Sequence, residues 1–71
     1  MDHGTYRQEH AIINCREIWH YLITSDIGNI HVVQWEHSVA NPYLEEFITR
    51  DIDKAERKFK VICNDILRGK R

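Results

Sequence analysis

The strongest constraint on the fold of this chain is a run of apolar residues at helical spacing through its last third. The run comprises Leu44, Ile48, Ile52, Ala55, Phe59, Ile62 and Ile66. Steps of three and four residues place these side chains on one side of a helix. Pro42 precedes the run and Gly69 follows it, and both are residue types that bound helices. The pattern predicts a long amphipathic helix over residues 43–68 that buries one face.

A second apolar stripe with the same spacing lies near the N-terminus. It comprises Ala11, Ile12, Cys15, Ile18, Trp19 and Leu22. With Thr5 as the N-cap, this stripe predicts a first helix over residues 6–24. The segment 25–29 reads as a break, because Gly28 and Asn29 tolerate left-handed backbone.

Residues 30–40 admit two interpretations. Val32, Trp35 and Val39 fit one face of a short helix that ends before Pro42. The same segment is rich in β-formers, and the preceding break can close a hairpin with residues 21–24. The helix is favoured, because an isolated hairpin needs further strands to be stable.

The predicted architecture is therefore a single all-α domain of three helices spanning residues 1–71, with residues 1–4 and 69–71 disordered. The alternative is an α-β-β-α arrangement with a short central hairpin. The core expected from the stripes comprises Ile12, Cys15, Ile18, Trp19, Leu22, Val32, Trp35, Val39, Leu44, Ile48, Ile52, Ala55, Phe59, Ile62 and Ile66.

Length and composition limit the class of protein. A chain of 71 residues with 42% hydrophobic and 30% charged residues is typical of one small folded domain. The sequence shows neither a run of about 20 apolar residues nor a signal peptide, so a cytoplasmic location without membrane contact is expected. Cys15 and Cys63 are expected to be buried free thiols.

The basic residues suggest one candidate function. From Lys54 onward the chain has seven bases and two acids, although its net charge is −1. A phosphate-binding helix would use Lys54, Arg57, Lys58, Lys60, Arg68, Lys70 and Arg71. Bases late in a helix are also what the helix dipole favours. Nucleic-acid binding is therefore kept as the alternative function.

No motif indicates a catalytic, metal or cofactor site. Glu17 and His20 form an E-x-x-H pair, the local unit of helical di-iron sites, but a second copy is missing. The cysteines and histidines lack the spacing of zinc sites. No catalytic residue, metal or cofactor is expected, and the chain is predicted not to be an enzyme. The five histidines lie in the acidic first half, which leaves pH sensing as a lesser idea.

The favoured function rests on surplus apolar surface. On the expected long helix, Tyr43, Phe47, Val61 and Leu67 flank the apolar stripe rather than belonging to it. Exposed apolar side chains beside an overlong helix indicate a partner or a second copy. The sequence therefore predicts a small non-enzymatic regulatory protein that acts by protein–protein contact, with homodimerisation as the simplest form. A high isoleucine content hints at an AT-rich coding sequence and so at a phage or viral inhibitor or adaptor.

Overall fold

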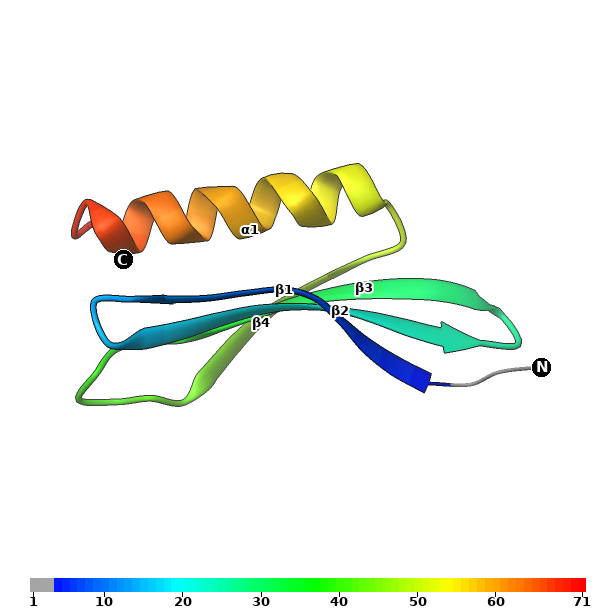
Figure 1. The fold of residues 1–71 in the computed structure, drawn as a ribbon, viewed down its shortest axis with the longest axis horizontal. Helices are drawn as coiled ribbons and strands as arrows, with labels where there is room; N and C mark the ends of the chain where they lie inside the picture. The colour runs from blue at the N-terminus through cyan, green and yellow to red at the C-terminus, as the bar shows by residue number, and fades with distance from the viewer. Residues whose placement is uncertain (1–3) are drawn as a thin grey trace.

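Residues 4–71, which the computed structural model describes, form an antiparallel sheet and one helix (Figure 1). The elements in chain order are β1 Gly4–Ile13, β2 Arg16–Ser25, β3 Gly28–Glu36, β4 Leu44–Thr49 and α1 Ile52–Leu67. Each strand pairs with the next, so the strand order is β1-β2-β3-β4. Helix α1 lies along one face of the sheet, as Figure 1 shows.

Two short turns impose the meander. Asn14 and Cys15 join β1 to β2 with φ angles of 51° and 64°, as a two-residue hairpin with the native strand twist requires. The Asn14 side chain donates a hydrogen bond of 3.1 Å to the Ile66 carbonyl, which fixes this turn to the helix. The second turn ends at Gly28, whose φ of 116° suits glycine.

The core lies between α1 and the sheet. Ile18, Val33 and Trp35 point towards the helix, which contributes four buried residues at steps of three and four: Ala55, Phe59, Ile62 and Ile66. Asp51 caps the helix N-terminus by accepting hydrogen bonds from the amides of Asp53 and Lys54. The second half of the C-terminal stripe is therefore helical and buried.

The expected all-α architecture is wrong. Residues 6–24 form β1 and β2 rather than a helix, and residues 30–40 lie mostly in β3. The α-β-β-α alternative fails too, because its first helix is absent, although β2 and β3 do pair around the break at residues 26–27. The description of this chain as a small helical protein is corrected accordingly.

The long helix is also shorter than expected. It begins at Ile52, and the first part of the stripe belongs to β4. Several residues expected in the core are exposed in the structure: Ile12, Val39, Leu44, Ile48 and Ile52. Cys15 is exposed in its turn rather than buried, whereas Cys63 is half-buried, and both thiols are free.

The last residues of the chain are held against α1. Lys70 donates its amide to the Asp65 carbonyl, and the Arg71 side chain forms an ion pair of 3.0 Å with Asp65. Gly4 lies within β1, while the disorder expected for residues 1–3 lies outside the described residues. Nowhere in residues 4–71 is there a helix with the length and apolar character needed to cross a membrane.

Candidate interaction surface

The sheet face opposite α1 carries eight apolar side chains, of which Val32 is buried and the others keep exposed surface. Because side chains alternate along a strand, the strand register places on this face Ile12, Trp19, Tyr21, Ile23, Ile30, Val32, Leu44 and Ile48. We call this surface the open face, since no helix or strand within residues 4–71 covers it (Figure 1). Its apolar side chains come from all four strands.

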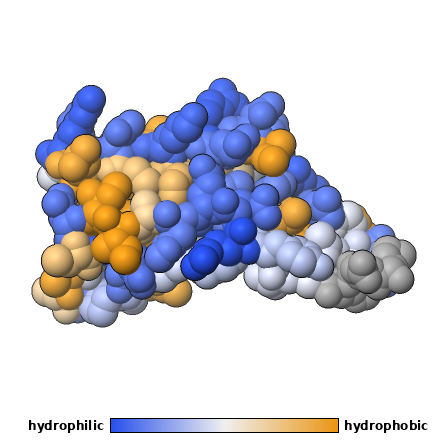
Figure 2. All heavy atoms as spheres, viewed as in Figure 1, coloured by the Kyte–Doolittle hydropathy of each residue, from blue (hydrophilic) through white to orange (hydrophobic). Residues whose placement is uncertain are grey.

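The open face leaves large apolar groups in contact with solvent. Ile12, Leu44 and Ile48 are 62%, 51% and 57% exposed, and Trp19 and Tyr21 are half-buried among them. In Figure 2, where α1 runs along the top and the open face is not turned towards the viewer, the surface over α1 is largely hydrophilic and hydrophobic atoms gather at the end where the helix C-terminus lies. Glu17 and Glu36 separate Ile12 from Leu44, so the continuous apolar area is the part around Trp19, Tyr21, Ile23, Ile30 and Ile48. Exposed apolar patches mark interaction sites in folded proteins.

Polar contacts within the open face hold its aromatic centre in place. The His10 ring stacks on Trp19 with 5.8 Å between ring centroids and 13° between planes. The His10 Nε2 atom lies 3.4 Å from a carboxylate oxygen of Glu17. Trp19 is thereby covered along one side while its remaining surface stays available to a partner.

Charge is divided between the two ends of the open face. Glu17, Glu36 and Glu46 lie towards the turn at residues 14–15. Arg7, opposite Tyr21, lies nearer the turn at residues 26–27. Arg50 is at that second end, where its guanidinium donates to the Ile27 carbonyl at 3.2 Å. Glu17 and Glu36 thus lie at one end of the open face, Arg7 is level with Tyr21 in its centre, and the other end carries Arg50 and the turn with Asp26.

A second unusual feature is a buried chain of polar groups beneath α1. His20 and His31 are 1% and 6% exposed. His20 Nδ1 lies 2.9 Å from a Glu9 carboxylate oxygen, and His20 Nε2 lies 3.0 Å from His31 Nδ1. An ionised carboxylate only accepts hydrogen bonds, so His20 Nδ1 carries a proton. With both rings neutral, His31 then donates to His20.

Burial, followed by the charge of neighbouring His20, lowers the pKa of His31 below its ordinary value of 6.5, with Glu56 and Asp51 opposing the shift. The unfolded chain then binds more protons than the folded one below pH 6.5. We expect the free energy of unfolding to fall as the pH drops below 6.5, by up to about 1.4 kcal/mol per pH unit for one proton. Urea titrations between pH 7.5 and 5 test this.

The variant His31→Gln should show a weaker pH dependence over this range. Glu45 is expected to cause a separate loss of folding stability at lower pH. Hydrogen bonding to His37 lowers the pKa of Glu45 below 4.5, so its stabilisation is lost only below that value. An unfolding free energy that stays flat or rises between pH 6.5 and 5 would contradict the expectation for His31.

The histidine chain borders a hollow of about 420 Å³ between β1 and α1, lined by Glu9, Phe59, Lys60, Cys63 and Asn64. Burial, then the charge of Glu9, raises the pKa of the Cys63 thiol. A thiol held in its protonated form is a poor nucleophile. The Cys63 thiol is therefore not an activated nucleophile in this hollow.

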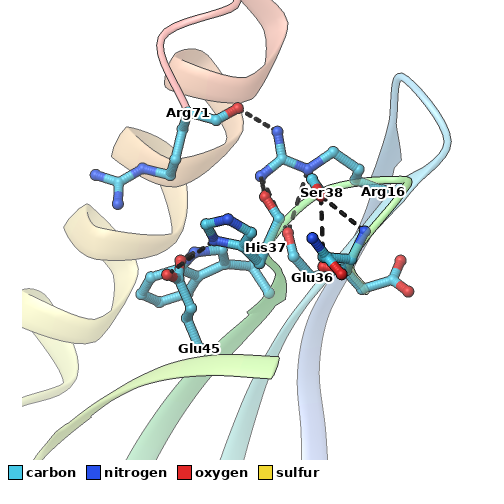
Figure 3. A network of polar contacts seen from close by, with 8 residues as sticks. Arg16, Glu36, His37, Ser38, Glu45 and Arg71 are labelled. Carbon is cyan, nitrogen blue, oxygen red and sulfur yellow. Dashed lines mark hydrogen bonds and ion pairs between the residues drawn. The ribbon is translucent and has the colours of Figure 1, made fainter. Parts of the chain in front are cut away.

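A third polar cluster joins the sheet to the C-terminus (Figure 3). The Arg16 side chain, which is buried, donates to the main-chain carbonyls of Glu36, His37 and Arg71. Next to it, Glu45 accepts hydrogen bonds from the Trp35 indole at 2.6 Å and from His37 at 3.1 Å. These contacts fix the β3–β4 connection and have a structural role.

The residues predicted from sequence to bind a partner occupy separate environments. Phe47 faces the helix and packs against the core. Tyr43 is exposed in the segment before β4 and stacks on His37 at 4.5 Å. Val61 and Leu67 are exposed on α1. The structure thus does not bring these four residues together on one surface, and a binding role for each stays a prediction.

The basic residues of the alternative function are also divided. Lys58 lies over the rings of Phe47 and Trp35 at 5.3 and 5.8 Å from their centroids, and Arg71 lies over Trp35 at 5.6 Å. Exposed positions are occupied by Lys54, Arg57, Lys60, Arg68 and Lys70. Lys58 and Arg71, two of the seven basic residues, therefore cover the edge of the core at Trp35.

The E-x-x-H pair is separated by the strand geometry. Residues three apart in β2 point to opposite faces, so Glu17 lies on the open face while His20 is buried beneath α1. Among the side chains that the structure describes, no group of three or more histidine, cysteine, aspartate or glutamate residues is arranged to hold a metal ion.

The sequence interpretation missed the open face because both faces of β2 are apolar or aromatic. The alternating series Trp19, Tyr21, Ile23 was the available signal for it. Comparison of the chain with models of protein families, with curated proteins and with solved structures gives no match. The function must therefore be inferred from the molecule's own surface.

Proposed function

We propose that this chain is a small non-enzymatic interaction protein that binds another protein surface through the open face of its sheet. The observation that carries the proposal is the uncovered apolar centre formed by Trp19 and Tyr21 on β2, Ile30 on β3 and Ile48 on β4. A sheet with apolar side chains on both faces is normally covered on both. Here α1 covers only one.

The composition of the open face fits a protein partner better than a nucleic acid. Its aromatic residues are of the kind enriched in protein interfaces, with polar groups around them. Three carboxylates lie at one end, from Glu17, Glu36 and Glu46, and they would repel a phosphate backbone. No contact described above favours the nucleic-acid alternative, so the protein-binding role is the one we develop.

A regulatory or adaptor role is the simplest use of the same surface, because a small domain of 71 residues can act by occupying a partner. A phage or viral origin and a cytoplasmic location are further proposals. The second is compatible with two free cysteines, since reducing compartments keep thiols unpaired.

A site-specific photo-crosslinker tests the proposal. Benzoylphenylalanine replaces Ile48 on the open face in one variant and Val61 on the outer side of α1 in another, and both side chains are about half exposed. After irradiation in cells that express the full chain, we expect covalent protein adducts from position 48 and few from position 61. Gel shifts and mass spectrometry of the adducts provide the measurement.

Position 61 serves as the matched control because it reports on the surface that the sequence favoured. Adducts from position 61 alone would indicate that the binding site lies on α1, as the sequence analysis predicted. An absence of protein adducts at position 48 in a folded variant would contradict the proposed function.

A further inference from the structure

We propose that the free edge of β1 binds an extended peptide segment of another protein, which adds to the sheet as a fifth strand and places an aliphatic side chain in the hollow between β1 and α1. This site is separate from the open face, so it adds a second mode of protein contact to the proposed function. It is supported by the outward-pointing main-chain groups of His10 and Ile12 and by the hollow beside them.

The outer edge of β1 leaves main-chain donors and acceptors without a partner strand. In the part of the chain that the structure describes, β1 pairs only with β2. The two-residue turn after β1 makes Ile13 a hydrogen-bonded partner of β2, and bonded pairs alternate with non-bonded ones along an antiparallel ladder. Ala11 and Glu9 therefore bond to β2 in the same way. The amide and carbonyl groups of His10 and Ile12 point away from β2 instead.

A bulge sets the length of this free edge. The register shifts between Arg7 and Glu9, which leaves Gln8 as the extra residue. Bulges interrupt and twist an edge strand, so the regular edge begins at Glu9 and ends at the turn after Ile13. Residues 9–13 span roughly 16 Å at about 3.3 Å per residue. A short peptide segment matches this length.

The hollow of about 420 Å³ lies on the helix side of the same edge, since Glu9 of β1 and Cys63 of α1 both line it. Side chains of an added strand alternate, so those across from Glu9 and Ala11 face α1. The lining has an apolar part, from Phe59 and Cys63, and two opposite charges, from Glu9 and Lys60. An aliphatic side chain suits it, because a charged one would be buried against Phe59 without a net opposite charge.

The opposite edge of the sheet differs in what lies beside it. There Lys58 of α1 lies over the ring of Phe47, 5.3 Å from its centroid. Following the alternation of bonded pairs across the sheet places the amide of Ile48 on the outer edge of β4. The β4 edge thus offers the same kind of main-chain groups beneath a cationic side chain, and it serves as the internal control.

A phage-displayed library of random dodecapeptides, selected on the full chain, supplies the probe. We expect the selected peptides to carry aliphatic side chains at alternate positions. When a selected peptide is bound, the amides of His10 and Ile12 should become protected from deuterium exchange, whereas in the free chain they exchange rapidly. The amide of Ala11 is paired with β2 and should be slow in both states. Nuclear magnetic resonance of the full chain measures all three amides.

Proline substitutions at the two edges test the site by affinity. Ile12→Pro removes an outward amide and keeps the bonds to β2, because proline is tolerated where an edge N–H faces solvent. It should weaken binding of the selected peptide roughly 10-fold or more. Ile48→Pro makes the same change on β4 and should leave the affinity within a factor of about 2. Fluorescence anisotropy of the labelled peptide gives the affinity, and circular dichroism confirms that both variants fold.

Two further changes test the hollow and the pairing. Asn64→Trp, at an exposed helix position that lines the hollow, should fill it and weaken binding, whereas Arg57→Trp, on the exposed side of α1 and outside that lining, should not. Methylating alternate amides of the peptide leaves the protein unaltered. Methylation of the set that faces β1 should abolish binding, and methylation of the other set should be tolerated.

Three results would overturn this proposal: selection that yields no peptide able to bind the free chain in solution, a bound peptide that leaves the amides of His10 and Ile12 unprotected, or binding that Ile48→Pro weakens as much as Ile12→Pro does. A peptide bound without protection of these amides would be on another surface, such as the open face. Crosslinking from position 48 reports on the open face alone, so the proposed function and the edge site can fail independently.

Discussion

Replacing Ile62 with alanine is expected to lower the free energy of unfolding by about 2–5 kcal/mol, the range for truncating a fully buried isoleucine. Ile62 has no exposed surface, and it packs in the cluster between α1 and the sheet. The native state of a domain this small is worth only about 4–10 kcal/mol. The variant should melt roughly 10–30 °C below the wild type, as measured by circular dichroism at fixed protein concentration.

Val61→Ala is the matched control, because Val61 is the preceding residue of the same helix and is 48% exposed. Its free energy of unfolding should change by no more than about 0.5 kcal/mol. Equal losses at positions 61 and 62 would mean that the helix is buried on a different side. Such a result would contradict the packing of α1 on the sheet.

The buried side of the helix was predictable from sequence because Ala55, Phe59, Ile62 and Ile66 keep helical spacing without interruption. The start of the helix was misplaced because Leu44 and Ile48, which lie in β4, happen to extend the same spacing. Two residues four apart in a strand also share a face, so they fit both periodicities.

The segment of β1 and β2 was mistaken for a helix because it lacks the clear alternation of apolar and polar residues that marks a strand. On the helix-facing side of β2, the residue between Ile18 and Leu22 is His20, a polar residue in a core position. The opposite side carries Trp19, Tyr21 and Ile23, so β2 shows no apolar–polar alternation. Pairing with Glu9 and His31 makes the buried histidine tolerable, and such pairing is formed only in the folded chain.

The composition did contain evidence for strands. Ten isoleucines against three alanines favour sheet over helix, and the Asn14–Cys15 dipeptide adopts a two-residue hairpin turn. The candidate surface could not be predicted without the sheet, because its members come from four strands. Five of its eight apolar members are among the residues that the sequence assigns to the core: Ile12, Trp19, Val32, Leu44 and Ile48.

Replacing Arg16 with methionine is expected to lower the free energy of unfolding by about 2–4 kcal/mol and to loosen the segment between β3 and β4. The guanidinium group is buried and donates to three carbonyls, those of Glu36, His37 and Arg71. Methionine keeps much of the side-chain volume but supplies no donor, and a buried acceptor left unpaired costs about 1–3 kcal/mol. Urea unfolding measures the stability of the fold.

Hydrogen exchange in the loop between β3 and β4 gives a second measurement. A general loss of core packing would speed exchange throughout the fold and not in this loop alone. The amide of His37 donates to the Tyr43 carbonyl across this loop, and it should exchange with deuterium faster in Arg16→Met than the amides of α1 do. Arg16→Lys should lie between the two proteins, because a single ammonium group cannot reproduce the planar fork of donors.

Arg57→Met, on the exposed side of α1, is the control for removing one positive charge and should change the free energy of unfolding by no more than about 0.5 kcal/mol. If Arg16→Met were as stable as this control, the three carbonyls would have to be satisfied by solvent. The Arg16 cluster would then be a consequence of the β3–β4 connection and not what holds it in place.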